Sequence, residues 1–165
     1  MNNEYEKVKN AYLQFLKNDG YLLENDVNER SITHKFAVYL ENEFSEWDVD
    51  CEYNRNGIDK KTLIGLKEKI DSDNLVGSTV YPDIIIHHRG SHDNYIVIEV
   101  KKDYYTEKKN AHDEKKLKLY KEQLGYKHAY FIKFPTKENF KNLELKKLDE
   151  CNYIELKFQT EDVRR

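Results

Sequence analysis

The stretches VYPDIIIHH (residues 80–88) and YIVIEVKK (residues 95–102) determine the fold of this chain. Both are rich in β-branched residues, and the turn-forming residues RGSHDN (89–94) separate them, which predicts a β-hairpin. Apolar side chains fill both odd and even positions, so both faces of each strand are expected to be covered by other elements. The hairpin is therefore predicted to lie at the centre of a covered sheet.

Three charged residues, Asp83, Glu99 and Lys101, interrupt these apolar strands. Asp83 and Glu99 are equally far along the chain from Ser91, in the middle of the turn. Antiparallel pairing about that centre places them opposite each other, with Cβ atoms about 4.5–5.5 Å apart. Glu99 and Lys101 are two residues apart and share a face of the sheet. Charge inside such strands is costly unless it is paired or coordinated, so the pattern predicts a functional site.

This trio fits metal-assisted hydrolysis of a phosphodiester. Two carboxylates so close repel each other, and a divalent cation resolves the conflict. Mg²⁺ commonly takes one or two carboxylates together with water and phosphate oxygens, and Lys101 beside it can hold or deprotonate a water. The alternative is a sheet edge at which Asp83 and Glu99 are solvated and Lys101 pairs with one of them.

Pro82-Asp83, followed after fifteen residues by Glu99-Val100-Lys101, resembles the motif of the PD-(D/E)XK nuclease superfamily. The expected order of elements over about residues 26–134 is similar as well. The resemblance implies a restriction-endonuclease-like fold and a nuclease that uses Mg²⁺ or Mn²⁺. It also implies that Asp83, Glu99 and the Val100 carbonyl bind the metal, and that Lys101 positions or activates the attacking water.

Members of this family often carry another acidic residue on the helix before the sheet, and Glu29 matches that position. It lies on the same helical stripe as Ile32 and Phe36, so the resemblance adds it to the catalytic and metal-binding set. The alternative is a capping box in which Asp26 is the N-cap and Glu29 the third residue after it. His34 is left out of the metal set, because five residues turn a helix by about 140°.

Some family members have a Q-x-x-x-Y pattern on the helix that follows the sheet motif. Lys116 and Tyr120 stand in the corresponding positions here, so this pattern is not met. The resemblance therefore assigns no exonuclease subfamily and leaves endonuclease and exonuclease activity both open.

The remaining sequence predicts helices and strands around the hairpin. Apolar residues at helical spacing indicate helices over residues 4–17, ended by Gly20, and over 28–45 and 107–125. Strands are expected at 48–54, 127–134 and 152–158, and a helical turn at 137–142. Residues 55–79 form a long polar insertion with a short helix around 61–70. This order predicts a single α/β domain of the α+β type over residues 1–165, with helices flanking a central mixed sheet.

Charge is unevenly distributed along the chain. Residues 1–100 carry 11 basic and 19 acidic side chains, whereas residues 101–147 carry 14 basic and 7 acidic ones. Such a basic segment predicts an anion-binding surface, and a solvated helix face is the alternative. The expected phosphate contacts are lysines that follow the last hairpin strand: Lys102, Lys108, Lys109, Lys115 and Lys116.

Other classes of protein are disfavoured. No stretch approaches 18 uncharged apolar residues, and the first ten residues, MNNEYEKVKN, lack the apolar region of a signal peptide. The two cysteines, Cys51 and Cys151, lack the spacing of a Cys-based zinc site. We therefore expect a reduced, cytoplasmic protein that does not bind membranes.

The sequence leads to three functional hypotheses. The first is an Mg²⁺- or Mn²⁺-dependent nuclease that acts on DNA in restriction, repair, recombination or defence against mobile elements, and that homodimerises to enlarge its footprint. The second is a nuclease-like fold that binds nucleic acid or assembles with proteins without much catalysis, because the acidic residues 1–100 weaken non-specific DNA affinity. The third is an RNA endonuclease with the same phosphodiester chemistry.

Overall fold

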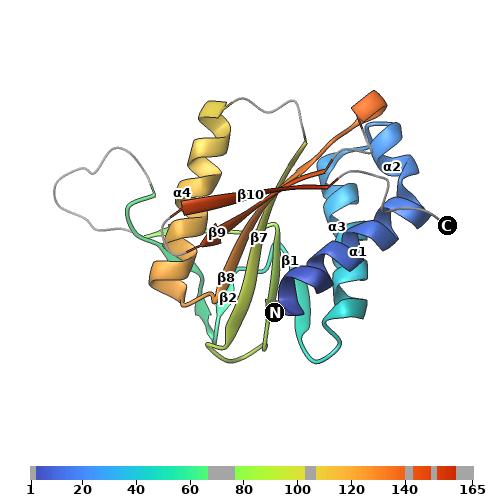
Figure 1. Cartoon of the computed structure of the whole chain (residues 1–165). Helices are drawn as coiled ribbons and strands as arrows, with labels where there is room; N and C mark the ends of the chain where they lie inside the picture. Colours follow the sequence, from blue (N-terminus) through green and yellow to red (C-terminus); the bar gives the residue numbers. More distant parts are fainter. Residues whose placement is uncertain (1–2, 67–76, 103–106, 140–142, 150–151, 159–165) are drawn as a thin grey trace.

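A six-stranded mixed sheet organises the chain in the computed structural model (Figure 1), which describes residues 3–66, 77–102, 107–139, 143–149 and 152–158. The strand order is β1-β6-β7-β8-β9-β10. These strands are β1 (Asp48–Cys51), β6 (Ile84–His87), β7 (Asn94–Lys102), β8 (His128–Phe134), β9 (Leu143–Asp149) and β10 (Asn152–Phe158). Neighbouring strands are antiparallel except β7 and β8, which are parallel. The expected α+β class with a mixed sheet is confirmed.

The predicted hairpin is formed by β6 and β7, two inner strands of the sheet. Its register pairs Ile84 with Ile98 and Ile85 with Val97. Continued by one residue, the same register puts Asp83 opposite Glu99, as the symmetry about Ser91 predicts. The register shifts only near the turn, where an irregularity follows Ile86.

Helices cover both faces of the sheet (Figure 1). One face carries α1 (Asn3–Asp19), the short α2 (Tyr21–Glu24) and α3 (Glu29–Glu43), and the other carries α4 (Glu107–Leu124). The first layer holds a buried aromatic cluster of Tyr12, Phe15, Phe36 and Phe134. The second layer is built from Val97, Leu117, Tyr120 and Phe131, which are fully buried.

The parallel pair of β7 and β8 requires a crossover, and α4 supplies it. Side chains alternate along β7, so Ile96, Ile98 and Val100 enter the α1–α3 layer while Val97 enters the α4 layer. Glu99 follows Val97 by two residues and consequently faces α4. The end of β7 thus delivers charged residues to the place where the two helical layers approach each other.

The described part of the insertion over residues 55–79 forms β-strands rather than a helix. It forms two small hairpins: β2 (Arg55–Asn56) with β3 (Asp59–Lys60), and β4 (Thr62–Leu63) with β5 (Ser78–Thr79). The helix expected around 61–70 is therefore wrong over residues 61–66, and residues 67–70 lie outside the described part. Burial explains the difference, because Lys61 and Leu63 are buried and Thr62 between them is exposed, which is the period of a strand.

Several expected boundaries are also corrected. The strand expected at 48–54 ends at Cys51 because Glu52 adopts a left-handed backbone with φ 51°. The strand expected at 80–88 starts only at Ile84. The helical turn expected at 137–142 is a 3-10 turn at Lys137–Asn139, and residues 140–142 lie outside the described part. Strand β9 was not predicted at all.

Helix α3 begins differently from the expected capping box. Asn28 is the N-cap, and its side-chain oxygen accepts a hydrogen bond from the Ser31 amide at 2.9 Å. Asp26 instead has a left-handed backbone, with φ 52°, and its carboxylate pairs with Lys102. The prediction of Asp26 as the N-cap is therefore wrong, and Glu29 is not part of a capping box with it.

Helix α1 ends at Asp19, directly before Gly20 as expected, although the Gly20 backbone is right-handed, with φ −53°, and the short α2 that follows was not predicted. Within the described residues, no helix is both long enough and apolar enough to cross a membrane.

The aromatic cluster gives a test of the first layer. We expect Phe36→Ala to lower the free energy of unfolding by about 3–5 kcal/mol, because it removes a fully buried ring and leaves a cavity. Val38→Ala on the same helix is the matched control, since Val38 is exposed, and its effect should stay within about 0.5 kcal/mol. Urea denaturation of both variants measures the difference, and equal losses would contradict the placement of Phe36 in the core.

Candidate active site

The charged residues of the hairpin gather at the C-terminal end of β7 with residues from two helices. Asp83 precedes β6, Glu99 and Lys101 lie on β7, and Glu29 comes from the first turn of α3. Helix α4 adds Asp113 and Lys116. We call these residues the carboxylate–lysine cluster: Glu29, Asp83, Glu99, Lys101, Asp113 and Lys116.

Asp83 is held in place by the neighbouring strand. Its Oδ2 accepts a hydrogen bond from the Val100 amide at 2.7 Å. This bond ties the residue before β6 to β7 beyond their last ladder pair. It fixes the carboxylate beside Lys101, whose Nζ lies 3.8 Å from Asp83 Oδ2.

Lys101 lies among three carboxylates. Its Nζ is 3.5 Å from Glu29 Oε1 and 3.8 Å from Asp113 Oδ2, in addition to its contact with Asp83. It also donates to the Val100 carbonyl at 2.9 Å. Burial alone lowers the pKa of Lys101, but the surrounding carboxylates outweigh it and the pKa is raised. The amine therefore stays protonated in this arrangement.

Glu99 is almost completely buried, at 1% exposure. Lys116 Nζ lies 2.8 Å from its Oε1 and 2.9 Å from its Oε2. Burial, reinforced by the charge of Asp83, raises the pKa of Glu99 to about 8 despite Lys116. The single ammonium group of Lys116 therefore does not offset burial and the charge of Asp83.

Glu29 points from α3 to the end of the sheet, as its helical stripe predicts. Its Oε2 accepts a hydrogen bond from the Lys102 amide at 3.3 Å. Burial, with the nearby charge of Asp83, raises the pKa of Glu29 although Lys101 opposes the shift. The structure thus brings all the predicted catalytic side chains together: Glu29, Asp83, Glu99 and Lys101.

The predicted phosphate contacts separate into different environments. Lys102 is 4% exposed, and its Nζ bonds the Asp26 carboxylate and two backbone carbonyls before α3. Its prediction as a phosphate contact is therefore wrong, because it is a buried link between β7 and the start of α3. Lys116 belongs to the cluster rather than to an open surface. Lys115 is exposed, and the side chains of Lys108 and Lys109 lie outside the described part.

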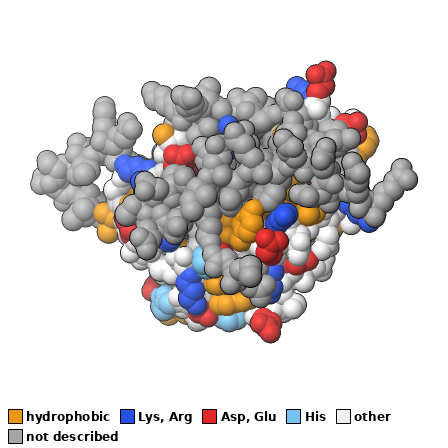
Figure 2. All heavy atoms as spheres, viewed as in Figure 1, with side chains coloured by type: hydrophobic (Ala, Val, Ile, Leu, Met, Phe, Trp, Pro, Cys, Tyr) orange, Lys and Arg blue, Asp and Glu red, His pale blue; other side chains and the backbone are white. Residues whose placement is uncertain are grey.

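On the face seen in Figure 2, the described residues form no large patch of only basic or only acidic side chains. Blue basic and red acidic side chains are interspersed around the grey atoms there. Part of the positive charge of residues 101–147 is paired with carboxylates inside the protein, as the contacts of Lys101, Lys102 and Lys116 show.

Asp113 and the cluster role of Lys116 were missed from the sequence. The signal was the helical spacing: Asp113, Lys116 and Tyr120 follow each other at steps of three and four, so they share a face of α4 with buried Leu117. The Tyr120 hydroxyl is buried without a hydrogen-bond partner among the described residues. Nothing in the hairpin sequence points to these positions.

The donor chemistry of the cluster fits a hard divalent cation. It offers only oxygens, from the carboxylates of Asp83, Glu99 and Glu29 and the carbonyl of Val100. A divalent cation bound there would lower the raised pKa of Glu99, because its charge stabilises the ionised carboxylate. Yet in the described part of the chain no three His, Cys, Asp or Glu side chains are arranged to hold a metal. Each proposed ligand instead contacts a lysine ammonium group.

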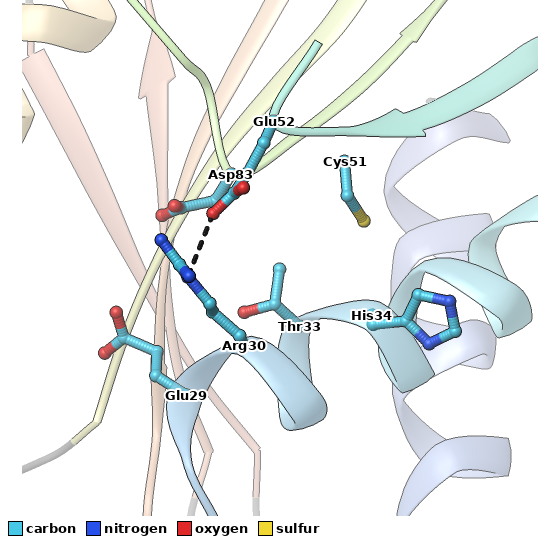
Figure 3. Close-up of a pocket in the computed structure, with 7 residues that line it drawn as sticks. All are labelled: Glu29, Arg30, Thr33, His34, Cys51, Glu52 and Asp83. Atoms are coloured by element: carbon cyan, nitrogen blue, oxygen red, sulfur yellow. Dashed lines mark ion pairs between the residues drawn. The ribbon is translucent and has the colours of Figure 1, made fainter.

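A hollow of about 210 Å³ adjoins the cluster (Figure 3). Glu29 and Asp83 lie at one end, and His34 and Cys51 lie at the other, with Thr33 between them. Arg30 spans the space and pairs with Glu52 at 3.2 Å (Figure 3). Burial raises the pKa of the Cys51 thiol to about 11, so this cysteine is not an activated nucleophile.

Comparison with known proteins gives no family assignment: no family model, curated protein or solved structure matches this chain.

The contact between Lys116 and Glu99 can be tested by stability. At pH 9, above the pKa of Glu99, we expect Lys116→Met to lower the free energy of unfolding by about 1.5–3 kcal/mol, because it removes a charged hydrogen bond to a buried carboxylate, which must then take up a proton. At pH 6 the carboxyl is protonated and the loss should be smaller. The matched control is Lys115→Met, an exposed neighbour on α4, for which urea denaturation should show little change at either pH.

Glu99 should also govern part of the pH dependence of stability. Its pKa is raised on folding, from an ordinary value of 4.5 to about 8, so between these values the folded state binds a proton that the unfolded state has lost. Stability must then fall as the pH rises through this window. We expect wild type to lose stability relative to Glu99→Gln from about pH 4.5 to 8, measured in EDTA. Parallel pH profiles would contradict the shift.

Proposed function

We propose that the protein is an Mg²⁺- or Mn²⁺-dependent nuclease that hydrolyses phosphodiester bonds in DNA, built on a restriction-endonuclease-like domain. The observation that carries the proposal is the convergence of Glu29, Asp83, Glu99 and Lys101 at one end of β7. Three separate segments of the chain supply these side chains to the end of the buried, largely apolar strands β6 and β7. Such a concentration of buried charge serves chemistry better than stability.

The cluster suggests a role for each residue. Asp83, Glu99 and the Val100 carbonyl would hold the metal, with Glu29 beside them. The bound ion would supply Lewis-acid chemistry and neutralise charge on the phosphate. Lys101, which lies among these carboxylates, would position or activate the attacking water and balance negative charge near the phosphate.

The arrangement of elements supports the same proposal. An acidic residue on α3, an antiparallel hairpin of β6 and β7, the crossover α4 and the parallel strand β8 follow in the order that the resemblance implies. The Asp83 bond to Val100 holds the two halves of the motif together.

A second candidate is a nucleic-acid-binding or assembly module with the same fold and no cleavage. The observation that favours it is the set of lysine contacts, because Lys101 and Lys116 already neutralise the carboxylates that a metal would use. Metal binding and cleavage therefore have to be measured separately.

A cleavage assay tests the proposal. Labelled single-stranded, duplex and branched DNA, with RNA alongside, are incubated with Mg²⁺, Mn²⁺ or EDTA. We expect metal-dependent cleavage of DNA, and a rate at least about 100-fold lower for Asp83→Asn and for Lys101→Ala, because each removes a group that acts on the reacting phosphate or water. Asp93→Asn, an exposed carboxylate near the turn of the hairpin, is the control that should keep the wild-type rate.

Each contrary result has its own meaning. Cleavage that survives Asp83→Asn would place the chemistry elsewhere. Cleavage of RNA alone would change the substrate. Binding of nucleic acid without cleavage in either metal would favour the second candidate, and calorimetric titration of wild type and Asp83→Asn with Mn²⁺ would then show whether the cluster binds a metal.

A further inference from the structure

The hollow beside the cluster continues along α3. It shares Glu29 and Asp83 with the cluster, so a group bound in it lies next to a group bound at the carboxylates (Figure 3). A second hollow, of about 420 Å³, is also lined by Arg30 and His34, together with Asp19 and Lys35. The two hollows share these two α3 residues, and only the first touches Glu29 and Asp83, so we call them together the track along α3.

Arg30 is placed to bind an anion in this track. Its side chain is 86% exposed, and its described ion pair is with Glu52, which is 54% exposed. Such an exposed pair stabilises a protein by about 0–1 kcal/mol, so Arg30 can exchange Glu52 for another anion at little cost. His34 lies one helical turn farther along the same helix and lines both hollows.

The group in the track that fits a phosphate is the guanidinium of Arg30, because carboxylates line much of the rest. A guanidinium group binds phosphate oxygens through two parallel hydrogen bonds. The first hollow is smaller than the roughly 300–1,000 Å³ of pockets for drug-sized ligands, so it suits one phosphate with its sugar rather than a base pair. Lys101 and Lys116 are engaged by carboxylates, so positive charge for a neighbouring phosphate has to come from another element.

We propose that Arg30 binds a backbone phosphate of the nucleic acid next to the phosphate that is cleaved, and that the strand leaves the cluster along α3 past His34. The inference rests on the proposed function and adds the path of the substrate to it. Glu52 opposes this contact, since its carboxylate occupies Arg30 and repels an incoming phosphate. The Arg30–Glu52 pair is therefore a barrier that the substrate displaces.

Binding without cleavage tests the path. Fluorescence anisotropy with a short labelled single-stranded DNA, in Ca²⁺ and in EDTA, gives the Kd over a range of salt, and a gel checks that the strand stays intact. We expect Arg30→Ala to weaken binding about tenfold or more, as for the loss of a charged hydrogen bond. The slope of log Kd against log salt should fall by about 0.7, the value for one phosphate on a single strand. Glu52→Gln should tighten binding.

The matched control is another exposed ion pair at the opposite end of β7, Lys127 with Asp93 at 3.1 Å. Lys127→Ala and Asp93→Asn should leave the Kd near the wild-type value. Arg30→Ala that behaves like Lys127→Ala would overturn the inference, while the nuclease proposal would still be decided by the cleavage assay. Wild type that binds no DNA would overturn the inference together with a role on DNA. Tighter binding in Glu52→Gln but not in Arg30→Ala/Glu52→Gln supports it most directly.

Discussion

The buried carboxyl group of Glu99 constrains the rest of the molecule. It lies inside an apolar layer, where a charged group requires a partner within a few ångströms, and among the described elements α4 provides one. Lys116 reaches Glu99 only when α4 has a particular rotation about its own axis and a particular position along β7. The contact therefore couples the position of α4 to the position of the charged strand end, and Asp113 reaches Lys101 as a result.

The two helical layers meet at the same end of the sheet because of the alternation along β7. Glu99 and Lys101 project toward α4, while Val100 and Lys102 project toward α3. Residues 99–102 of β7 thus contact the helices on both faces of the sheet. The apolar cores below hold the strand in place, so that charged groups which repel or attract one another keep fixed distances.

Local pattern was enough to predict the hairpin. Its register follows from the symmetry about Ser91, because turn residues and β-branched strands act over short distances, and this register already opposes Asp83 and Glu99. Tertiary contacts decided the rest. Asp and Asn are equally favourable residue types at an N-cap, so the sequence does not choose between Asp26 and Asn28. In the structure the carboxylate of Asp26 pairs with Lys102, and Asn28 caps the helix. Lys115 and Lys116 are identical neighbours, and only the docking of α4 makes one exposed and the other a partner of Glu99.

The wide sequence separation within the cluster has a consequence for folding. The hairpin joins residues close in sequence, so its closure entropy is small, whereas the bond between Glu29 and the Lys102 amide spans 73 residues. Contacts of such long range form late in the folding of a domain, after local pairs have reduced the search. A partly folded or nascent chain can hold the hairpin without assembling the carboxylates around Lys101. Any chemistry at this cluster is thereby reserved for molecules that have completed their fold.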